Sequence, residues 1–140
     1  MTTHENETTA RLTALILKLP SLIDPEIERH GQWFSGAFQL KIGEIPFLVT
    51  VAGGKIASVD RGPFFLKTYQ FSIAATEEAW SKFWQPIPEP GWHDIFALAK
   101  RGAATIEGNL QPLMANLQYV KDVLAAPRKQ PAQTIAGAPR

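Results

Sequence analysis

The sequence predicts a single α+β domain, in which helices cover one face of a five-stranded, mostly antiparallel sheet. The first observation is the alternation of apolar and polar residues in the middle of the chain, which is the period of a half-buried strand. The second is the spacing of apolar residues by three and four on either side of this region, which indicates amphipathic helices. The third is the length of 140 residues with 45% hydrophobic and 19% charged residues, which is typical of one globular domain.

Four strands are expected to follow one another along the chain. They are predicted over residues 34–42, 45–51, 55–60 and 65–75. Gly43-Glu44 and Gly53-Gly54 form the first two turns, and both glycines of the second pair can take the positive φ that a tight hairpin needs. Arg61-Gly62-Pro63 breaks the third strand. Because short connections join the four strands, we expect them to pair mostly antiparallel.

Two helices are predicted ahead of the sheet. Apolar residues repeat at helical spacing from Thr9 to Leu19, and Pro20 ends the run. Asp24-Pro25-Glu26 supplies an N-cap and a proline for the start of a second helix, which His30-Gly31 ends. The first helix is expected to lie on the sheet. The alternative is a helix that docks onto a partner protein, because a terminal helix detaches more easily than a central one.

Large apolar side chains concentrate in the helices that follow the fourth strand. Thr76 is expected to cap the first of these helices, with acidic residues in its first turn. Three aromatic residues fall on one face of this helix: Trp80, Phe83 and Trp84. Asp94 is expected to cap a second, shorter helix that ends at Arg101, and Gly102 stands where a left-handed C-terminal cap belongs.

A short strand and a final helix complete the predicted domain. The strand over residues 104–107 is the fifth of the sheet, and its pairing, parallel or by a crossover, stays open. Asn109 opens the helix, with Pro112 in the first turn, where the missing N–H costs nothing. Six apolar residues are expected to form one stripe along this helix: Leu110, Leu113, Met114, Leu117, Val120 and Leu124.

This order of elements resembles the sterol-carrier-protein-2 (SCP2) family of lipid-binding domains. The resemblance rests on four segments, ATEEAWSKFW, DIFALAKRG, GAATIEGN and LQPLMANLQYV, and covers roughly residues 33–124. The run of Gly102 followed by Ile106-Glu107-Gly108-Asn109 is its most specific part. One departure is the proline-rich loop WQPIPEPGW, which replaces a short basic link of the family and is expected to border the cavity mouth.

The resemblance implies an apolar tunnel between the sheet and the helix layer, which takes a fatty acyl or sterol-like tail without catalysis. An apolar cavity with few polar groups is the usual form of such a site. The flexible side chain of methionine suits a lining that adapts to irregular ligands. Ten residues are expected to contact the ligand: Phe38, Phe47, Phe71, Trp80, Phe83, Trp84, Phe96, Leu113, Met114 and Leu117.

The sequence offers few groups for catalysis, metal binding or cofactors. It has no cysteine, which excludes disulfides, thiolate metal ligands and cysteine nucleophiles. Its three histidines lack metal-ligand spacing, and no serine stands in a Gly-x-Ser-x-Gly setting. His93-Asp94 is interpreted as part of a helix cap rather than as a catalytic pair. We therefore expect neither enzyme activity, nor a cofactor, nor a metal.

Charge and hydropathy narrow the class of partner. The formal net charge of +1 gives no strong field to hold nucleic acid, and no apolar run approaches the ~20 residues of a transmembrane helix. The polar N-terminus is unlike a signal peptide, so a cytoplasmic, bacterial protein is expected, either monomeric or a weak homodimer. Residues 1–8 and 127–140 are expected to be disordered ends of a lipid-binding domain at residues 9–126.

Two functions fit these observations. The first is binding of a hydrophobic small molecule or lipid, as a carrier or as an accessory module to a partner enzyme. The second is a protein-interaction domain with a filled core, which docks through its N-terminal helix or through the loop of tryptophans and prolines. Exposed tryptophan and proline side chains suit such a partner surface.

Overall fold

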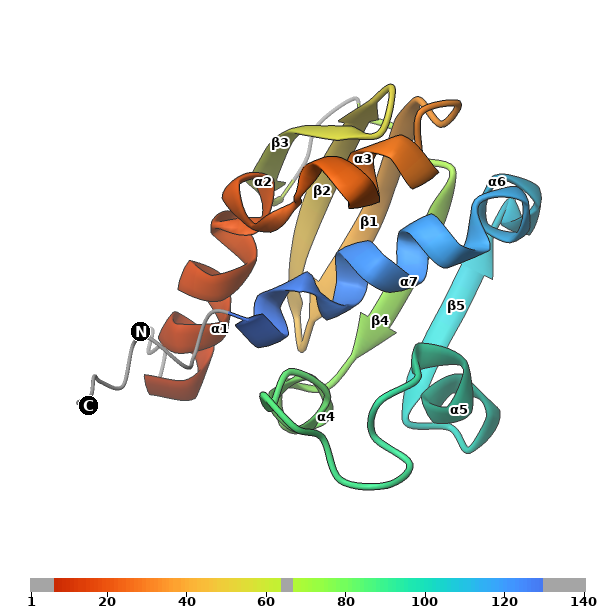
Figure 1. Cartoon of the computed structure of the whole chain (residues 1–140). Coiled ribbons are helices and arrows are strands. Elements are labelled where there is room, and N and C mark those ends of the chain that lie inside the picture. The colour runs from red at the N-terminus through yellow and green to blue at the C-terminus, as the bar shows by residue number, and fades with distance from the viewer. Residues whose placement is uncertain (1–6, 64–66, 130–140) are drawn as a thin grey trace.

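The computed structural model describes residues 7–63 and 67–129, which form a five-stranded sheet with helices on one of its faces (Figure 1). The strands are β1 (Gly36–Ile42), β2 (Ile45–Ala52), β3 (Lys55–Arg61), β4 (Phe71–Ala75) and β5 (Ala104–Gly108). The helices are α1 (Glu7–Leu17), α2 (Leu19–Leu22), α3 (Pro25–His30), α4 (Glu77–Phe83), α5 (Ile95–Lys100), α6 (Leu110–Ala115) and α7 (Leu117–Ala125). A 3-10 turn, η1 (Ala126–Lys129), follows α7.

The sheet has the strand order β3-β2-β1-β4-β5. The pairs β1–β2, β2–β3 and β4–β5 are antiparallel, and β1–β4 is parallel. The mostly antiparallel, five-stranded α+β fold is therefore confirmed. The fifth strand pairs with β4 at the edge of the sheet, with Ile73 opposite Ile106.

The fourth strand differs from its prediction in extent and in connection. It begins at Phe71, while the predicted start falls on residues 64–66, which lie outside the described residues. Since β3 is an edge strand and β4 pairs with β1, the segment between them crosses over instead of making a hairpin. At its end, the Gln70 N–H donates to the Ala37 carbonyl at 2.8 Å. The expectation that the first four strands pair mostly antiparallel is confirmed, with β4 as the exception: it pairs parallel with β1, and local alternation does not reveal which strand becomes a neighbour.

The predicted caps are confirmed. The side chains of Asp24, Thr76 and Asp94 accept hydrogen bonds from the first-turn N–H groups of α3, α4 and α5. Gly102 follows α5 with a φ of +84°, in the left-handed region where glycine is favoured. Nothing lies within 4 Å of a Cβ built at Gly102, so the backbone conformation rather than crowding requires glycine there.

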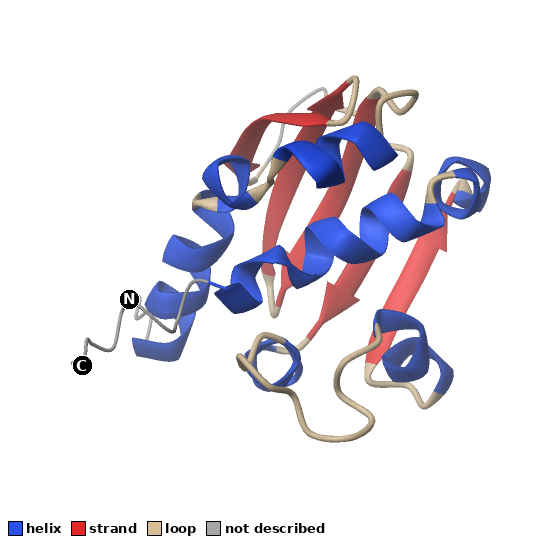
Figure 2. Ribbon diagram, in the orientation of Figure 1, coloured by secondary structure: helices blue, strands red, loops and turns tan. Residues whose placement is uncertain are grey.

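The predicted final helix is divided in two. Asn116, with φ −124° and ψ 36°, separates α6 from α7, and its side-chain amide donates to the Pro112 carbonyl at 2.9 Å. Figure 2 shows α7 running across the helix-covered face, while α6 stands beside it at the end of β5. Leu113 is buried, but Leu110 and Met114 are 42% and 56% exposed. The prediction of a single apolar stripe was therefore wrong for Leu110 and Met114, because the break at Asn116 turns α6 relative to α7.

The helices share the covering of one sheet face. α1 packs against β3 and α4, α2 packs against β3, and α3 packs against α7 (Figure 1). The N-terminal helix is thus part of the domain, with Leu12, Leu15 and Ile16 buried. Within the described ranges, no helix combines the length and hydropathy needed to cross a bilayer.

The expected disordered ends, residues 1–8 and 127–140, fall largely outside the described residues. The described part extends into both: α1 starts at Glu7, and η1 ends at Lys129. In η1, Arg128 Nε donates to the Phe83 carbonyl at 2.8 Å and Nη2 donates to the His93 carbonyl at 3.0 Å. Arg128 therefore joins the end of α7 to α4 and to the loop before α5.

Two truncations test where the stable domain ends. Deleting residues 130–140 should change the Tm by less than about 2 °C, because that segment contains little large apolar surface to bury. Deleting residues 128–140 should lower the Tm by about 3–6 °C, since two carbonyls lose a charged donor. Arg128→Ala in the full chain should reproduce most of this loss in a thermal melt. An equal loss on deleting residues 130–140 alone would contradict the boundary.

Candidate functional site

A layer of aromatic side chains lies between the sheet and the helices. Phe38 and Phe71, neighbours in the β1–β4 register, stack with centroids 5.1 Å apart and an interplanar angle of 4°. On α4, Trp80 stacks on Trp84 at 4.7 Å and meets the Phe83 ring edge-on at 5.6 Å. All five side chains are almost completely buried. We refer to these five residues as the aromatic layer.

The two buried indoles of the aromatic layer each reach a backbone carbonyl. Trp80 Nε1 donates to the Lys41 carbonyl on β1 at 2.9 Å. Trp84 Nε1 donates to the Leu124 carbonyl on α7 at 2.7 Å. A buried N–H without an acceptor costs about 1–3 kcal/mol, so these bonds hold α4 in one position against the sheet and against α7.

Tyr119 makes a similar connection from α7 to the β2–β3 turn. Its hydroxyl donates to the Gly54 carbonyl at 2.7 Å, and its ring meets Phe34 edge-on at 6.0 Å. A Cβ built on Gly31 would lie 2.3 Å from the Tyr119 ring, so only glycine permits this close packing. Burial, with a smaller effect of the nearby Glu28 charge, raises the pKa of Tyr119 well above its usual value. The hydroxyl therefore remains protonated as a donor.

The structure brings most of the sequence-predicted ligand contacts together beneath the helices. Phe38, Phe47, Phe71, Trp80, Phe83, Trp84 and Leu113 are buried, while Phe96 and Leu117 are partly buried. Met114 differs: it is 56% exposed on α6, so the expectation that it faces an interior space was wrong. The break at Asn116, which periodicity did not reveal, accounts for its outward position.

Partly buried apolar side chains stand on α5, β5 and α7. Phe96 and Ile106 are partly buried and pack against the core from α5 and β5. Leu117 lies one turn before Lys121, so helical spacing places both on one face of α7. Lys121 Nζ is 3.7 Å from Asp94 Oδ1 and 5.4 Å from the Phe96 ring centroid. We call these five residues, Asp94, Phe96, Ile106, Leu117 and Lys121, the α5–α7 edge. The sequence did not reveal that Lys121 and Asp94 form an ion pair.

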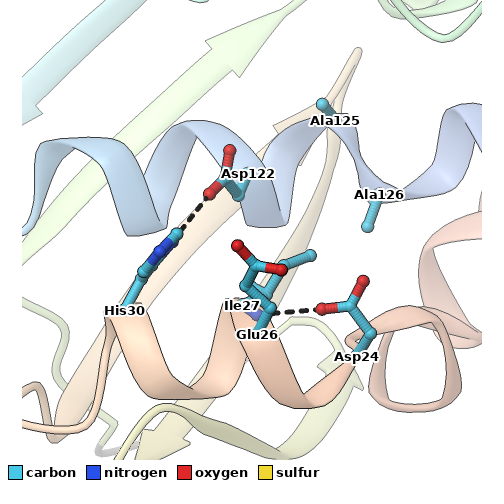
Figure 3. A pocket seen from close by; sticks show the side chains of 7 residues that line it. All are labelled: Asp24, Glu26, Ile27, His30, Asp122, Ala125 and Ala126. Atoms are coloured by element: carbon cyan, nitrogen blue, oxygen red, sulfur yellow. Dashed lines mark hydrogen bonds and ion pairs between the residues drawn. The ribbon is translucent and has the colours of Figure 1, made fainter.

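A separate surface pocket of about 250 Å³ lies between α3 and α7 (Figure 3). It is lined by Asp24, Glu26, Ile27, His30, Asp122, Ala125 and Ala126. His30 Nδ1 lies 3.4 Å from Asp122 Oδ2, and Asp122 Oδ1 accepts from Gln118 Nε2 at 2.9 Å. Asp24 Oδ1 accepts from the Ile27 N–H at 2.9 Å. The Asp24 carboxylate caps α3, and the Asp122 carboxylate of α7 pairs with His30 of α3. The acidic groups of this pocket therefore serve to hold the two helices in place.

The proline-rich loop packs onto α4 and α5 through Trp92. The Lys82 ammonium and the Arg101 guanidinium lie 4.8 Å and 4.4 Å from the Trp92 ring centroid. Ile87, in contrast, is 89% exposed. The loop is thus attached at its ends and presents an apolar side chain to solvent.

Among residues 7–63 and 67–129, no group of three or more His, Cys, Asp or Glu side chains is arranged to hold a metal ion.

Comparison with solved structures identifies the fold. A crystal structure of sterol carrier protein 2 matches with a TM-score of 0.64 and 15% identity, over 89% of this chain and 98% of that chain. A UbiJ-SCP2 ubiquinone synthesis protein matches with a TM-score of 0.52 and 12% identity, over 92% of this chain and 98% of its own. Palmitated SCP2L2 from Aedes aegypti matches with a TM-score of 0.50 and 20% identity, over 84% of this chain and 95% of that chain. At these identities the likeness establishes an SCP2-like fold.

Comparisons by sequence are negative. No protein-family model matches the chain, and no curated protein matches it.

Replacing Tyr119 by phenylalanine tests the hydrogen bond that connects α7 to the hairpin. The ring stays on Gly31, but the Gly54 carbonyl loses its donor, so the free energy of unfolding should fall by about 1–2 kcal/mol in urea titrations. Trp33→Phe is the control and should change it by less than about 0.5 kcal/mol, because Trp33 is 87% exposed. An unchanged stability of Tyr119→Phe would show that water satisfies the carbonyl equally well.

The raised pKa of Tyr119 also predicts a pH dependence. Above the ordinary tyrosine pKa of 10.0, the unfolded chain loses the Tyr119 proton while the folded protein keeps it. Deprotonation then favours the unfolded state, so the stability of the wild type should fall as the pH rises above about 10. Tyr119→Phe should show a smaller decline over the same range. If the stabilities of the two proteins fell in parallel over this pH range, the prediction of a raised Tyr119 pKa would be wrong.

Proposed function

We propose that this protein binds a hydrophobic ligand with a long apolar tail, a fatty acyl or sterol-like lipid, between its sheet and its helix layer. The observation that carries the proposal is the SCP2-like fold combined with the concentration of large apolar side chains on the helix-covered face. The palmitated state named for one structural neighbour supports the same class of ligand. The role is binding rather than catalysis.

The ligand enters at the α5–α7 edge. Phe96, Ile106 and Leu117 are only partly buried there, whereas Trp80 and Trp84 are fixed deeper in the interior by hydrogen bonds. Between α5 and α7 this edge has one partly solvated ion pair, Asp94–Lys121, beside apolar contacts that separate and re-form at low cost, so it yields before the rest of the helix layer does. Each methylene group that leaves water contributes about 0.8 kcal/mol, which drives the tail inward.

The protein serves as a carrier or as an accessory module to a partner enzyme. The ubiquinone synthesis protein among the structural neighbours supports the accessory role, because it is named for a biosynthetic process. The polar side chains identified above cap helices or connect elements, as do Asp24, Asp94 and Asp122. Such a module holds the tail and leaves the chemistry to the enzyme.

A second function, a protein-interaction domain, is favoured by one observation. Ile87 is 89% exposed between Pro86 and Pro88, in a loop that is attached at Trp84 and Trp92. Prolines reduce the conformational entropy that docking must overcome. The alternative docking site, the N-terminal helix, is less suited because its apolar face is already buried in the domain.

Palmitate titration tests the lipid-binding proposal. In a Trp33→Phe background, which removes an exposed reporter, palmitate should change the fluorescence of the buried tryptophans saturably, and native mass spectrometry should show one bound ligand. Leu117→Trp should weaken palmitate binding at least fivefold while changing the free energy of unfolding by less than about 1 kcal/mol, since the new ring occupies ligand space.

The matched control is Ala115→Trp, which adds the same ring at an exposed position of α6 and should leave palmitate binding unchanged. If the interior is a filled core, Leu117→Trp is overpacking and should cost about 1–3 kcal/mol. That cost, together with no fluorescence response to palmitate, would overturn lipid binding in favour of the interaction domain.

A further inference from the structure

The lysine of the α5–α7 edge stands at the boundary between the apolar interior and solvent. Its side chain is 36% exposed, and its neighbours on α7, Val120 and Leu124, are buried. The ammonium lies 5.4 Å from the Phe96 ring centroid, so the charge of this side chain stands beside an apolar ring and still reaches water. This is the arrangement that an amphiphile also adopts at such a boundary.

Lys121 has a weakly engaged charge. Its ammonium is 3.7 Å from Asp94 Oδ1, which is an ion-pair distance but longer than a hydrogen bond. Asp94 Oδ1 also accepts the Phe96 N–H at 3.0 Å, so the same oxygen already has a helix-capping role. The N–H donors of Lys121 are therefore available to a second carboxylate that approaches from the edge.

A second cation close to the interior, Arg128, is engaged differently. Arg128 donates from Nε to the Phe83 carbonyl and from Nη2 to the His93 carbonyl, and its guanidinium lies 4.4 Å from the Phe83 ring centroid. Moving Arg128 to a ligand would leave two backbone carbonyls without their donor. Lys121 loses only a partly solvated ion pair, which contributes little to stability.

We propose that Lys121 binds the carboxylate headgroup of the ligand, which selects a fatty acid or another lipid carboxylate over neutral lipids of the same tail. This inference rests on the proposed lipid-binding function and adds a headgroup site to it. The tail lies beneath Phe96 and Leu117, and the headgroup replaces Asp94 as the partner of Lys121. Asp94 thereby competes with the ligand for the ammonium.

The experiment compares palmitate with hexadecanol, which has the same chain length and no charge, at pH 8. Lys121→Gln should weaken palmitate binding about five- to tenfold and leave hexadecanol binding within twofold, as expected for the loss of a charged hydrogen bond. Lys121→Arg should restore most of the palmitate affinity. Lys100→Gln removes a charge of the same kind from an exposed position on α5 and should change neither ligand's affinity.

A second variant should act in the opposite direction. Asp94→Asn keeps an N-cap acceptor for the Phe96 N–H but removes the carboxylate that competes for Lys121. Palmitate binding should therefore strengthen about two- to fivefold, again without an effect on hexadecanol. A merely structural role of the ion pair would instead weaken both ligands in both variants.

The outcomes separate the two proposals. If the wild type binds palmitate and hexadecanol but Lys121→Gln affects them equally or not at all, the headgroup site is overturned and lipid binding stands. Weaker palmitate binding by Asp94→Asn also overturns the headgroup site. If the wild type binds neither ligand, the proposed function fails, and the headgroup site fails with it.

Discussion

The fold depends on a simple constraint: three large aromatic side chains are buried, and each has a polar atom that must find an acceptor. Trp80, Trp84 and Tyr119 solve this by donating to backbone carbonyls of other elements, at 2.7–2.9 Å. Apolar contacts alone would allow α4 and α7 to slide over the sheet, because dispersion and the hydrophobic effect are not directional. The three hydrogen bonds remove that freedom. They connect α4 to β1, α4 to α7, and α7 to the β2–β3 turn.

This constraint divides the helix layer into a fixed part and a part that can yield. Where Trp84 reaches the Leu124 carbonyl, movement would break a buried hydrogen bond. At the α5–α7 edge, the partly buried ring of Phe96 packs on the core, and the Lys121 ammonium lies 5.4 Å from the centroid of that ring. A domain that admits a lipid needs both parts, since the fixed part preserves the fold while the other part opens. The α5–α7 edge therefore lies where the buried hydrogen bonds of Trp80, Trp84 and Tyr119 do not reach.

Much of the fold could be predicted from the sequence because its signals are local. Strand alternation, the caps at Thr76 and Asp94, and the left-handed Gly102 each depend on a few neighbouring residues. The failures involve information that is not local. The parallel pairing of β4 with β1 depends on a crossover, and the break at Asn116 depends on how α6 and α7 each pack. The contacts of the α5–α7 edge join α5 to α7, which no spacing along the chain reveals. The sequence therefore predicted the apolar side chains of the interior but not the ion pair at the α5–α7 edge.

If the protein binds lipid as we propose, its selectivity for a headgroup must come from the boundary of the interior rather than from the interior itself. Neighbours with 12–15% identity keep the architecture, so what they share is a shape that many combinations of apolar residues can fill. Apolar side chains discriminate ligands by size, at about 0.8 kcal/mol for each methylene group. They discriminate headgroups poorly, because a tail presents the same surface whatever it carries. Selection by headgroup must come from a polar group at the point where the interior meets water. In our proposal that point is the α5–α7 edge, where Lys121 exchanges its ion-pair partner Asp94 for the headgroup.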